Sequence, residues 1–233
     1  MSKEEFLEGK HPKQDFQVER IAFFSDAVFA IAITLLVIEF RAPIIGKDTT
    51  HAELWHELKE MKLKLLALLF SFLLIITYWV RHHSLFKHIH NYNKKIIMAN
   101  MLCLLPIIFF PFTTSFLYES IPSDNELIVV PYRLFFFNHI LAGVTMCYFY
   151  WLVMKRYKTF AYPMEKDDAE EFESKLLVMT ISFILVFAIS FISFKYSAFG
   201  ILPVILKNLY KKFFTRKDKK PIIHAEQKSS AGN

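Results

Sequence analysis

The chain has 233 residues, of which 54% are hydrophobic and 17% aromatic, with 26 phenylalanines but only five glycines. A soluble domain usually has about 45–50% apolar residues, and this excess is more than one water-soluble core of this size can bury. The composition excludes intrinsic disorder, a collagen-like repeat and a disulfide-stabilised secreted module. The scattered glycines leave no phosphate-binding loop of the GxGxxG or GxxxxGK type. The two cysteines, Cys103 and Cys147, lie in apolar runs, and we expect them to act as small hydrophobic residues.

The net charge of +6 is a property of the C-terminal region. Residues 207–220 contain seven Lys and Arg residues against Asp218, so the rest of the chain is neutral in sum. The main body therefore offers no basic face to a nucleic acid, and no nucleic-acid partner is expected. A basic cluster just after an apolar segment is typical of a cytoplasmic tail that faces lipid headgroups.

In chain order, residues 1–20 mix acidic and basic side chains and lack the apolar core and cleavage site of a signal peptide. We expect them to form a cytoplasmic N-terminus. The N-terminal stretch is followed by apolar segments. Their lengths are close to or above the ~20 residues that a membrane-spanning helix needs. They are Ile21–Phe40, Leu63–Val80, Ile96–Leu117, Val129–Met154, Leu176–Phe194 and a weaker Tyr196–Tyr210, which carries Pro203 and is expected to be kinked or partly interfacial.

None of these segments alternates like a β-strand, and lipid admits only helices or closed barrels, because every backbone polar group must be paired. The sequence therefore predicts an all-α integral membrane protein with six transmembrane helices. Residues 21–210 would form the transmembrane domain, and residues 211–233 a basic cytoplasmic tail. Lys and Arg are concentrated after the second and fourth segments and in the tail, whereas residues 118–128 carry none. This bias predicts that both termini are cytoplasmic, although the first loop, with Arg41 and Lys47, argues weakly against it.

Asp26 is the most informative polar residue, because it lies about six residues, or ~9 Å, into the first segment. An ionised Asp in mid-membrane costs ~2.5–3.5 kcal/mol on insertion scales, so its side chain should face protein or water. The predicted orientation brings polar residues of the next two segments to a similar depth. We expect a buried network in which Asp26 and Ser25 take partners from Trp79, His82 or His83, and Asn100; the alternative is that Asp26 reaches out to the interface.

In the outer half of the first segment, Ile31, Leu35 and Ile38 recur at helical spacing with Thr34 beside them. Periodicity alone favours a lipid-facing or core stripe here. A second candidate is the histidine run at His82, His83, His88 and His90. It contains no Cys or carboxylate to complete a zinc site, so we expect no metal site. No nucleophile elbow occurs either, and no catalytic residue or enzyme activity is expected.

Three motifs together resemble a known family. Arg20 to Asp26 read R-x-x-x-F-S-D at the start of the first segment, and Tyr78 to Phe86 read Y-W-x-x-H-H-x-x-F in the second. The third segment begins with Asn100 and ends in Pro-Phe-Thr-Thr at residues 111–114. These patterns and the six-helix plan resemble prokaryotic homologues of the lysosomal potassium channel called transmembrane protein 175.

The resemblance implies a potassium-permeable cation channel that conducts passively, with K⁺ as the permeant ion and no cofactor. It also implies a homotetramer in the cell membrane, with the first helices of four subunits around a central pore. Ile31 would be the narrowest ring of a hydrophobic gate, with Thr34 as a polar layer and Leu35 and Ile38 continuing the pore wall. The network it implies comprises Arg20, Phe24, Ser25, Asp26, Trp79 and one or both of His82 and His83.

Without the family resemblance, the residues are also compatible with other classes of protein. A proton-coupled secondary transporter would be expected to show inverted repeats and broken helices, and neither is evident. A membrane metalloenzyme would have to use the histidine run. No feature of the sequence excludes a purely structural scaffold.

Overall fold

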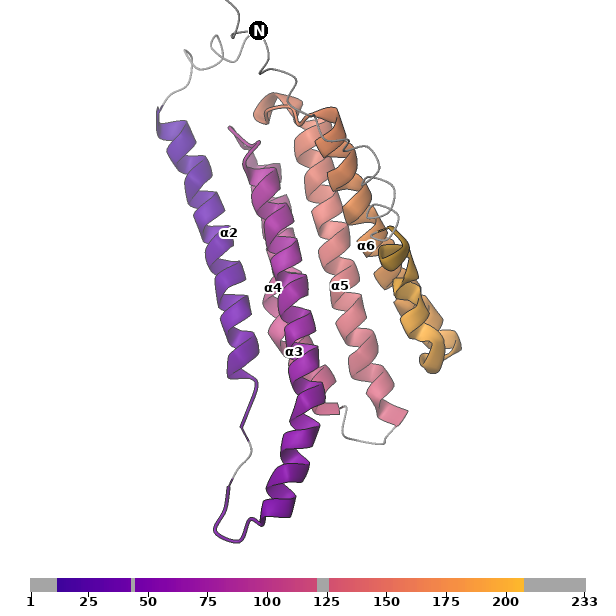
Figure 1. Cartoon of the computed structure of the whole chain (residues 1–233). Coiled ribbons are helices and arrows are strands. Elements are labelled where there is room, and N and C mark those ends of the chain that lie inside the picture. Colours follow the sequence, from indigo (N-terminus) through magenta and orange to yellow (C-terminus); the bar gives the residue numbers. More distant parts are fainter. Residues whose placement is uncertain (1–11, 43–44, 121–125, 208–233) are drawn as a thin grey trace, which may run out of the picture.

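The computed structural model describes residues 12–42, 45–120 and 126–207, and nearly all of them lie in helices (Figure 1). The long helices are α2 (Pro12–Ile38), α3 (His51–Phe86), α4 (Lys94–Ser120), α5 (Val129–Tyr150) and α6 (Lys166–Ile192). They run side by side in alternating direction, with α2 at one edge of the bundle and α6 at the other (Figure 1). Short 3₁₀ segments are η1 (Glu126–Ile128), η3 (Lys158–Phe160) and η4 (Phe194–Ile201), and α5 continues into a π-helical turn, η2 (Trp151–Arg156).

Five of these helices, with η2 counted as part of the fourth, are long and apolar enough to cross a membrane. They coincide with the first five predicted segments, so the prediction of an all-α membrane protein is confirmed. Three helices begin about ten residues earlier than their apolar segments do, among them α6 at Lys166. The helix α2 starts at Pro12 and α3 at His51, where Thr50 and Glu53 form a capping box that pairs free backbone N–H groups.

The sixth predicted segment, Tyr196–Tyr210, is not one continuous α-helix in its described part. The chain leaves α6 after Ile192, forms the 3₁₀ segment η4 and returns to helix at residues 202–207. Gly200 allows η4 to lie against the backbone of α6, because a Cβ there would come 2.3 Å from the backbone nitrogen of Val186. Arg133 of α5 stabilises this end of α6 by donating from Nη2 to the carbonyl of Ser190 at 2.8 Å. Residues 208–210, like the predicted tail at 211–233, lie outside the described part.

Burial is unevenly distributed among the helices. In the apolar windows of α4 and α5, 56% of residues are buried, against 22% in α2 and α3. Large apolar side chains of α2 and α3 therefore face away from the subunit's own core. In a membrane protein such faces meet either lipid or another protein subunit.

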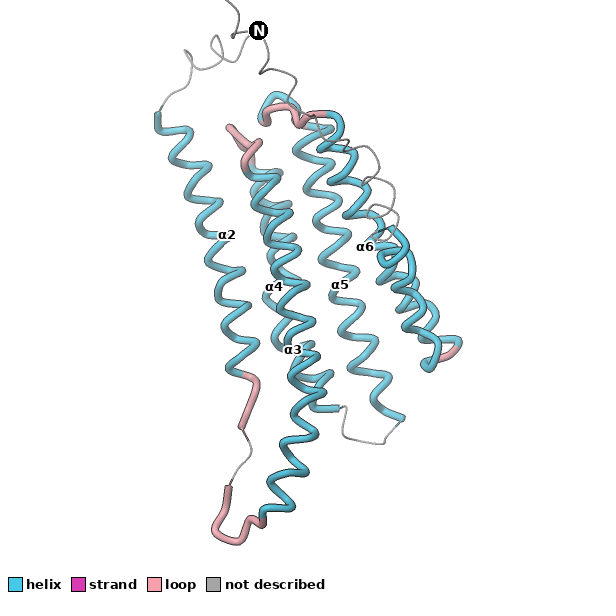
Figure 2. The backbone as a smooth tube through the Cα atoms, viewed as in Figure 1, coloured by secondary structure: helices cyan, strands magenta, loops and turns pink. Residues whose placement is uncertain are grey.

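Two connections at one end of the bundle are hydrogen-bonded to each other. The turn after α3 and the turn before α6 meet in an isolated antiparallel bridge between Ile89 and Ala161. The backbone N–H of Tyr162 also donates to the carbonyl of His88 at 2.7 Å. Both connections lie at the upper end in Figure 2, where α2 begins and α3 ends. These contacts between residues 88–89 and 161–162, called the clamp below, fix the end of α3 that carries the polar residues described next.

Candidate functional site

A hydrogen-bonded chain of three fully buried side chains links α2, α3 and α4. The Nδ2 of Asn100 in α4 donates to the Oγ of Ser25 in α2 at 2.9 Å. The Nε2 of His82 in α3 lies 2.7 Å from the Oδ1 of Asn100. Because an amide oxygen only accepts, this contact requires the tautomer of His82 that carries its proton on Nε2. Ser25 in turn donates to the carbonyl of Ile21, one helical turn earlier.

Asp26 forms the second link between α2 and its neighbours. The indole Nε1 of Trp79 in α3 donates to the Oδ1 of Asp26 at 2.9 Å. Trp79 and His82 lie three positions apart, on one face of α3. Ser25 and Asp26 are adjacent, and they point to different helices, Ser25 toward α4 and Asp26 toward α3. Two successive residues thus fix the rotation of α2 about its own axis.

Aromatic side chains surround the buried part of this network. The ring of His82 lies 4.7 Å from that of Phe86 and 5.4 Å from that of Phe29, centroid to centroid. Phe149 of α5 stacks on its other side at 5.8 Å. These rings exclude water, and hydrogen bonds in such an environment are electrostatically stronger than in water.

The four histidines of the run contact different parts of the structure. The sequence could not predict which of them joins the network. His82 joins Asn100, whereas His83 stacks its ring on Trp79 at 5.4 Å. His88 lines a groove between α3 and α6, and His90 packs against the ring of Tyr162. Among residues 12–42, 45–120 and 126–207, no three His, Cys, Asp or Glu side chains are grouped so that they could hold a metal ion.

Arg20 and Phe24 are not brought into this network within the subunit. Both are exposed on α2, Phe24 by 53%. The reason is helical periodicity, at about 100° per residue. Phe24 precedes Ile31 by two turns and Arg20 precedes it by about three, so both lie on the face that carries Ile31, away from Ser25.

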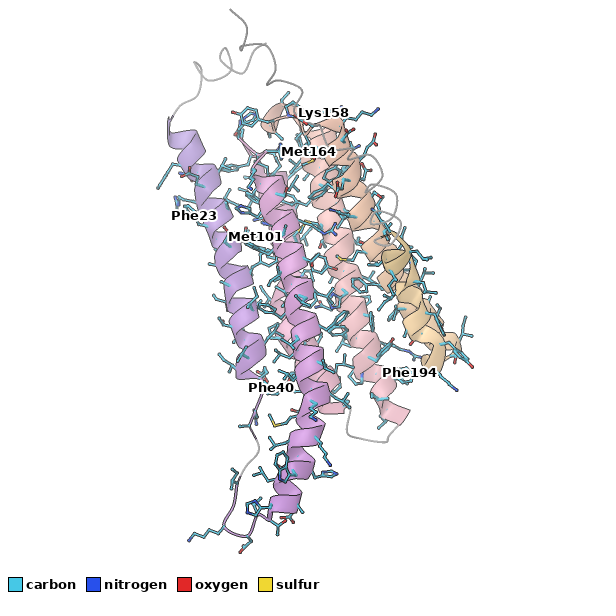
Figure 3. All side chains as sticks on the ribbon, viewed as in Figure 1. Phe23, Phe40, Met101, Lys158, Met164 and Phe194 are labelled. Carbon is cyan, nitrogen blue, oxygen red and sulfur yellow. The ribbon has the colours of Figure 1, made fainter. Side chains whose placement is uncertain are left out.

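The predicted stripe lies on the outward face of α2. Ile31 is 58% exposed, Leu35 37% and Ile38 69%. Thr34 is also exposed, and its hydroxyl donates to the carbonyl of Ile31 at 2.8 Å. The inward face of the same helix carries the buried residues Phe29, Ala32 and Leu36. The stripe is therefore not part of the subunit's core; exposed side chains project from α2 in Figure 3, where Phe23 is labelled.

Further polar contacts join the helices outside this network, and the sequence analysis did not predict their pairings. The hydroxyl of Thr114 in α4 donates to the Oγ of Ser71 in α3 at 2.9 Å, and both residues are buried. The Tyr78 hydroxyl donates to the carbonyl of His139 at 3.0 Å. Tyr118 donates to the carbonyl of Glu39 where α2 ends. Thr114 belongs to the Pro-Phe-Thr-Thr motif, whereas Ser71 was missed; its position within an apolar segment is the signal that could have drawn attention to it.

His139 of α5 is fully buried, and neither ring nitrogen has a hydrogen-bond partner in the described part of the chain. Phe110, Phe135 and Phe183 surround it at centroid distances of 4.5–4.8 Å. Because an unpaired buried polar group costs ~1–3 kcal/mol, His139→Leu is expected to raise the melting temperature of the purified protein in detergent.

The adjacent Asn138 provides the control for that measurement. Its Nδ2 donates to the carbonyl of Pro106 at 3.0 Å, so Asn138→Leu removes a satisfied bond and should lower the melting temperature. A melting temperature that falls as far for His139→Leu as for Asn138→Leu would show that the imidazole is paired in the folded protein.

Five apolar helices joined by buried inter-helix hydrogen bonds define a multi-pass integral membrane protein. Residues 20–111 match the family model described as endosomal/lysosomal potassium channel TMEM175. Over this stretch the chain resembles prokaryotic homologues of TMEM175, the family that its motifs predicted. The matched residues begin at Arg20 and include every member of the network, from Ser25 to Asn100.

Individual relatives resemble about half of the chain. The chain is 35% identical over 106 residues to a potassium channel of Streptomyces collinus, covering 46% of this chain and 50% of that protein. It is 37% identical over 114 residues to a potassium channel of Chamaesiphon minutus, covering 46% and 52%. The chain therefore spans about half the length of the curated relatives it matches.

The fold agrees over a longer stretch than the sequence does. The crystal structure of a lysosomal potassium-selective channel TMEM175 homolog from Chamaesiphon minutus superposes with a TM-score of 0.68 at 26% identity. That superposition covers 83% of this chain and 97% of the other. The part beyond residue 111 thus follows the same arrangement of helices.

Proposed function

We propose that this chain is the subunit of a potassium-permeable cation channel and that it conducts passively, down the electrochemical gradient. One observation carries the proposal: α2 is held by Ser25 and Asp26 on one side, while Ile31, Leu35 and Ile38 face away from the subunit. A helix that is fixed in rotation and presents an apolar stripe outward is suited to forming a pore wall with its copies. The relatives named above are themselves described as potassium channels.

The assembly we propose is a homotetramer in which four α2 helices surround one axis. The chain lacks a TVGYG segment, so backbone carbonyls of that type cannot select the ion. A ring of four Ile31 side chains would form the narrowest point, and such a hydrophobic constriction gates by excluding or admitting water. Leu35 and Ile38 continue the wall for about seven residues, or ~10 Å.

Thr34 supplies the polar layer beside this constriction. Its hydroxyl proton is used by the carbonyl of Ile31, which leaves the oxygen lone pairs free to face a cation. K⁺ releases its water more easily than Na⁺ does, so a narrow, weakly polar ring favours K⁺. Selectivity of this origin should be modest.

The network has a positioning role in this mechanism. Asp26 and Ser25 lie five and six residues before Ile31, about 8–9 Å along the helix. Their bonds to Trp79 and Asn100 set the rotation that directs the stripe to the axis. Within the tetramer, Arg20 and Phe24 would lie on the same side of α2 as the stripe, at the cytoplasmic entrance of the pore. There they could contact neighbouring subunits.

We place the protein in the cell membrane with both termini on the cytoplasmic side. The first residues of α2 and the clamp after α3 then lie inside. At the other end, Glu39, Glu57 and Glu119 line a groove of about 560 Å³ together with Arg41 and Lys64, and Lys64 pairs with Glu119 at 2.8 Å. Acidic side chains at an outer mouth raise the local concentration of cations.

Reconstitution of the purified chain into liposomes tests the function directly. With an outward K⁺ gradient we expect K⁺ efflux that makes the liposome interior electrically negative, and slower flux when Na⁺ replaces K⁺. Empty liposomes made from the same lipids are the control. Absence of flux, or flux that requires a proton gradient, would reject passive conduction in favour of a scaffold or a coupled transporter.

A further inference from the structure

We propose that the groove between α3 and α6 binds a membrane phospholipid, with the headgroup phosphate on the guanidinium of Arg81. The groove has a volume of about 520 Å³. The C-terminal turns of α3 and the N-terminal turns of α6 form its walls. It lies beside Met164, labelled near the upper end of the bundle in Figure 3.

Arg81 is the reason to expect an anion here. Its Nη1 is buried and has no hydrogen-bond partner among the described residues. By contrast, Arg133 donates twice to Ser190 and lies 3.9 Å above the ring of Phe191. An arginine stays charged at all physiological pH values, so the buried and unpaired Nη1 of this half-buried side chain needs an acceptor, preferably an anion. Its planar fork of N–H donors matches two oxygens of a phosphate.

Further polar groups stand beside Arg81 in the same groove. Ser84 follows one turn later on α3, and His88 lies just beyond the helix end. Both offer hydrogen-bond donors to phosphate oxygens. Lys175 on the α6 wall pairs with Glu171 of its own helix, so its charge is already balanced there.

The position of the groove favours a lipid over a dissolved phosphate. Toward the membrane interior its wall is apolar, formed by Ile76 and by Val80, which is 51% exposed. Toward the helix ends the wall carries polar side chains, Arg81, Ser84 and His88 on the side of α3, beside the apolar Met164 and Phe172. An apolar wall below a polar one that carries Arg81 fits an amphiphile whose acyl chains lie along α3 while its phosphate reaches Arg81.

The acidic residues of the α6 wall restrict the ligand further. Asp168 and Glu171 also line the groove. A phosphate monoester or free phosphate carries a charge of about −1.5 to −2 at pH 7 and would be repelled by the carboxylate of Asp168, whereas Glu171 is balanced by Lys175. A phosphodiester carries a single negative charge and leaves less repulsion to overcome, so the glycerophospholipid headgroup is the better match.

Native mass spectrometry of the full-length assembly in detergent tests the proposal, with added phosphatidylglycerol and phosphatidylethanolamine as probes and glycerol phosphate as the chain-free comparison. We expect both lipids to bind and glycerol phosphate not to bind. Arg81→Gln should weaken lipid binding about tenfold, since charge-assisted hydrogen bonds are lost. Arg81→Lys, which keeps the charge but not the fork, should give an intermediate affinity.

Lys95→Gln is the matched control, because it removes an exposed positive charge at the same end of the bundle but outside the groove. It should leave lipid binding unchanged. Equal binding by the parent protein and Arg81→Gln overturns the proposal, as does equal binding of glycerol phosphate. If Arg81→Gln instead reduces the number of subunits in the assembly, Arg81 meets a second copy of the chain and the groove is a subunit interface. Should Arg81→Gln not fold, wild-type affinity of Arg81→Lys for both lipids would overturn the bidentate contact.

Discussion

Replacing Ile31 with Asn is expected to raise potassium conductance about tenfold, the effect of lowering the permeation barrier by ~1.4 kcal/mol. Four amide side chains in place of four isoleucines would keep the narrowest ring wetted, and water in the ring removes the dewetting barrier. K⁺ flux from proteoliposomes, or single-channel current in a planar bilayer, measures this effect. The exposure of Ile31 on the free face of α2 is the structural basis for choosing this position.

Val37→Asn is the control for this substitution. Val37 is 61% exposed on the same helix, but six residues from Ile31 it points to a different side. Its substitution should leave the conductance near that of the parent protein. An unchanged conductance in Ile31→Asn would place Ile31 away from the pore, and an equal gain in both variants would point to a general loosening of the assembly.

Replacing Asp26 with Ala is expected to impair both assembly and conduction. The variant loses the acceptor of the Trp79 indole N–H and leaves that donor unpaired in a partly buried site. An unpaired donor of this kind costs ~1–3 kcal/mol. In a tetramer every subunit loses this much stability, so the melting temperature and the fraction of tetramer should both fall.

Asp26→Asn separates the hydrogen bond from the charge. The amide oxygen can still accept from Trp79, so this variant should stay close to the parent in melting temperature and in flux. Size-exclusion chromatography with light scattering gives the oligomeric state, and the liposome assay gives the flux. Parent-like stability and full flux in Asp26→Ala would contradict the positioning role proposed for this network.

In the same network, the depth of each residue in the membrane could be predicted from the sequence, but not every pairing. The depth of Asp26, Trp79 and Asn100 could be predicted, because depth depends only on the number of residues from the end of each apolar segment. The choice between His82 and His83 could not be made that way. Adjacent residues differ little in depth and by about 100° in direction, so only the packed position of α3 against α4 could decide it.

The last apolar segment shows a similar limit. Its composition predicted a weak span, but the 3₁₀ path of η4 depends on a tertiary contact, the approach of Gly200 to the backbone of α6. The contacts of Arg133 with Ser190 are likewise between helices distant in sequence. Neither contact leaves a local pattern, because neither follows a helical repeat.

The sequence alone determined that the chain crosses the membrane as helices, and where five of them lie, because lipid requires each apolar segment to pair its own backbone. Its motifs also indicated the family that residues 20–111 resemble. The tertiary structure decided which side chains meet: Ser25 with Asn100, Asp26 with Trp79, and Arg20 and Phe24 on the outward face with Ile31. The physical reason is that these contacts depend on how each helix is rotated against its neighbours, and that rotation is set by the packing of the whole bundle.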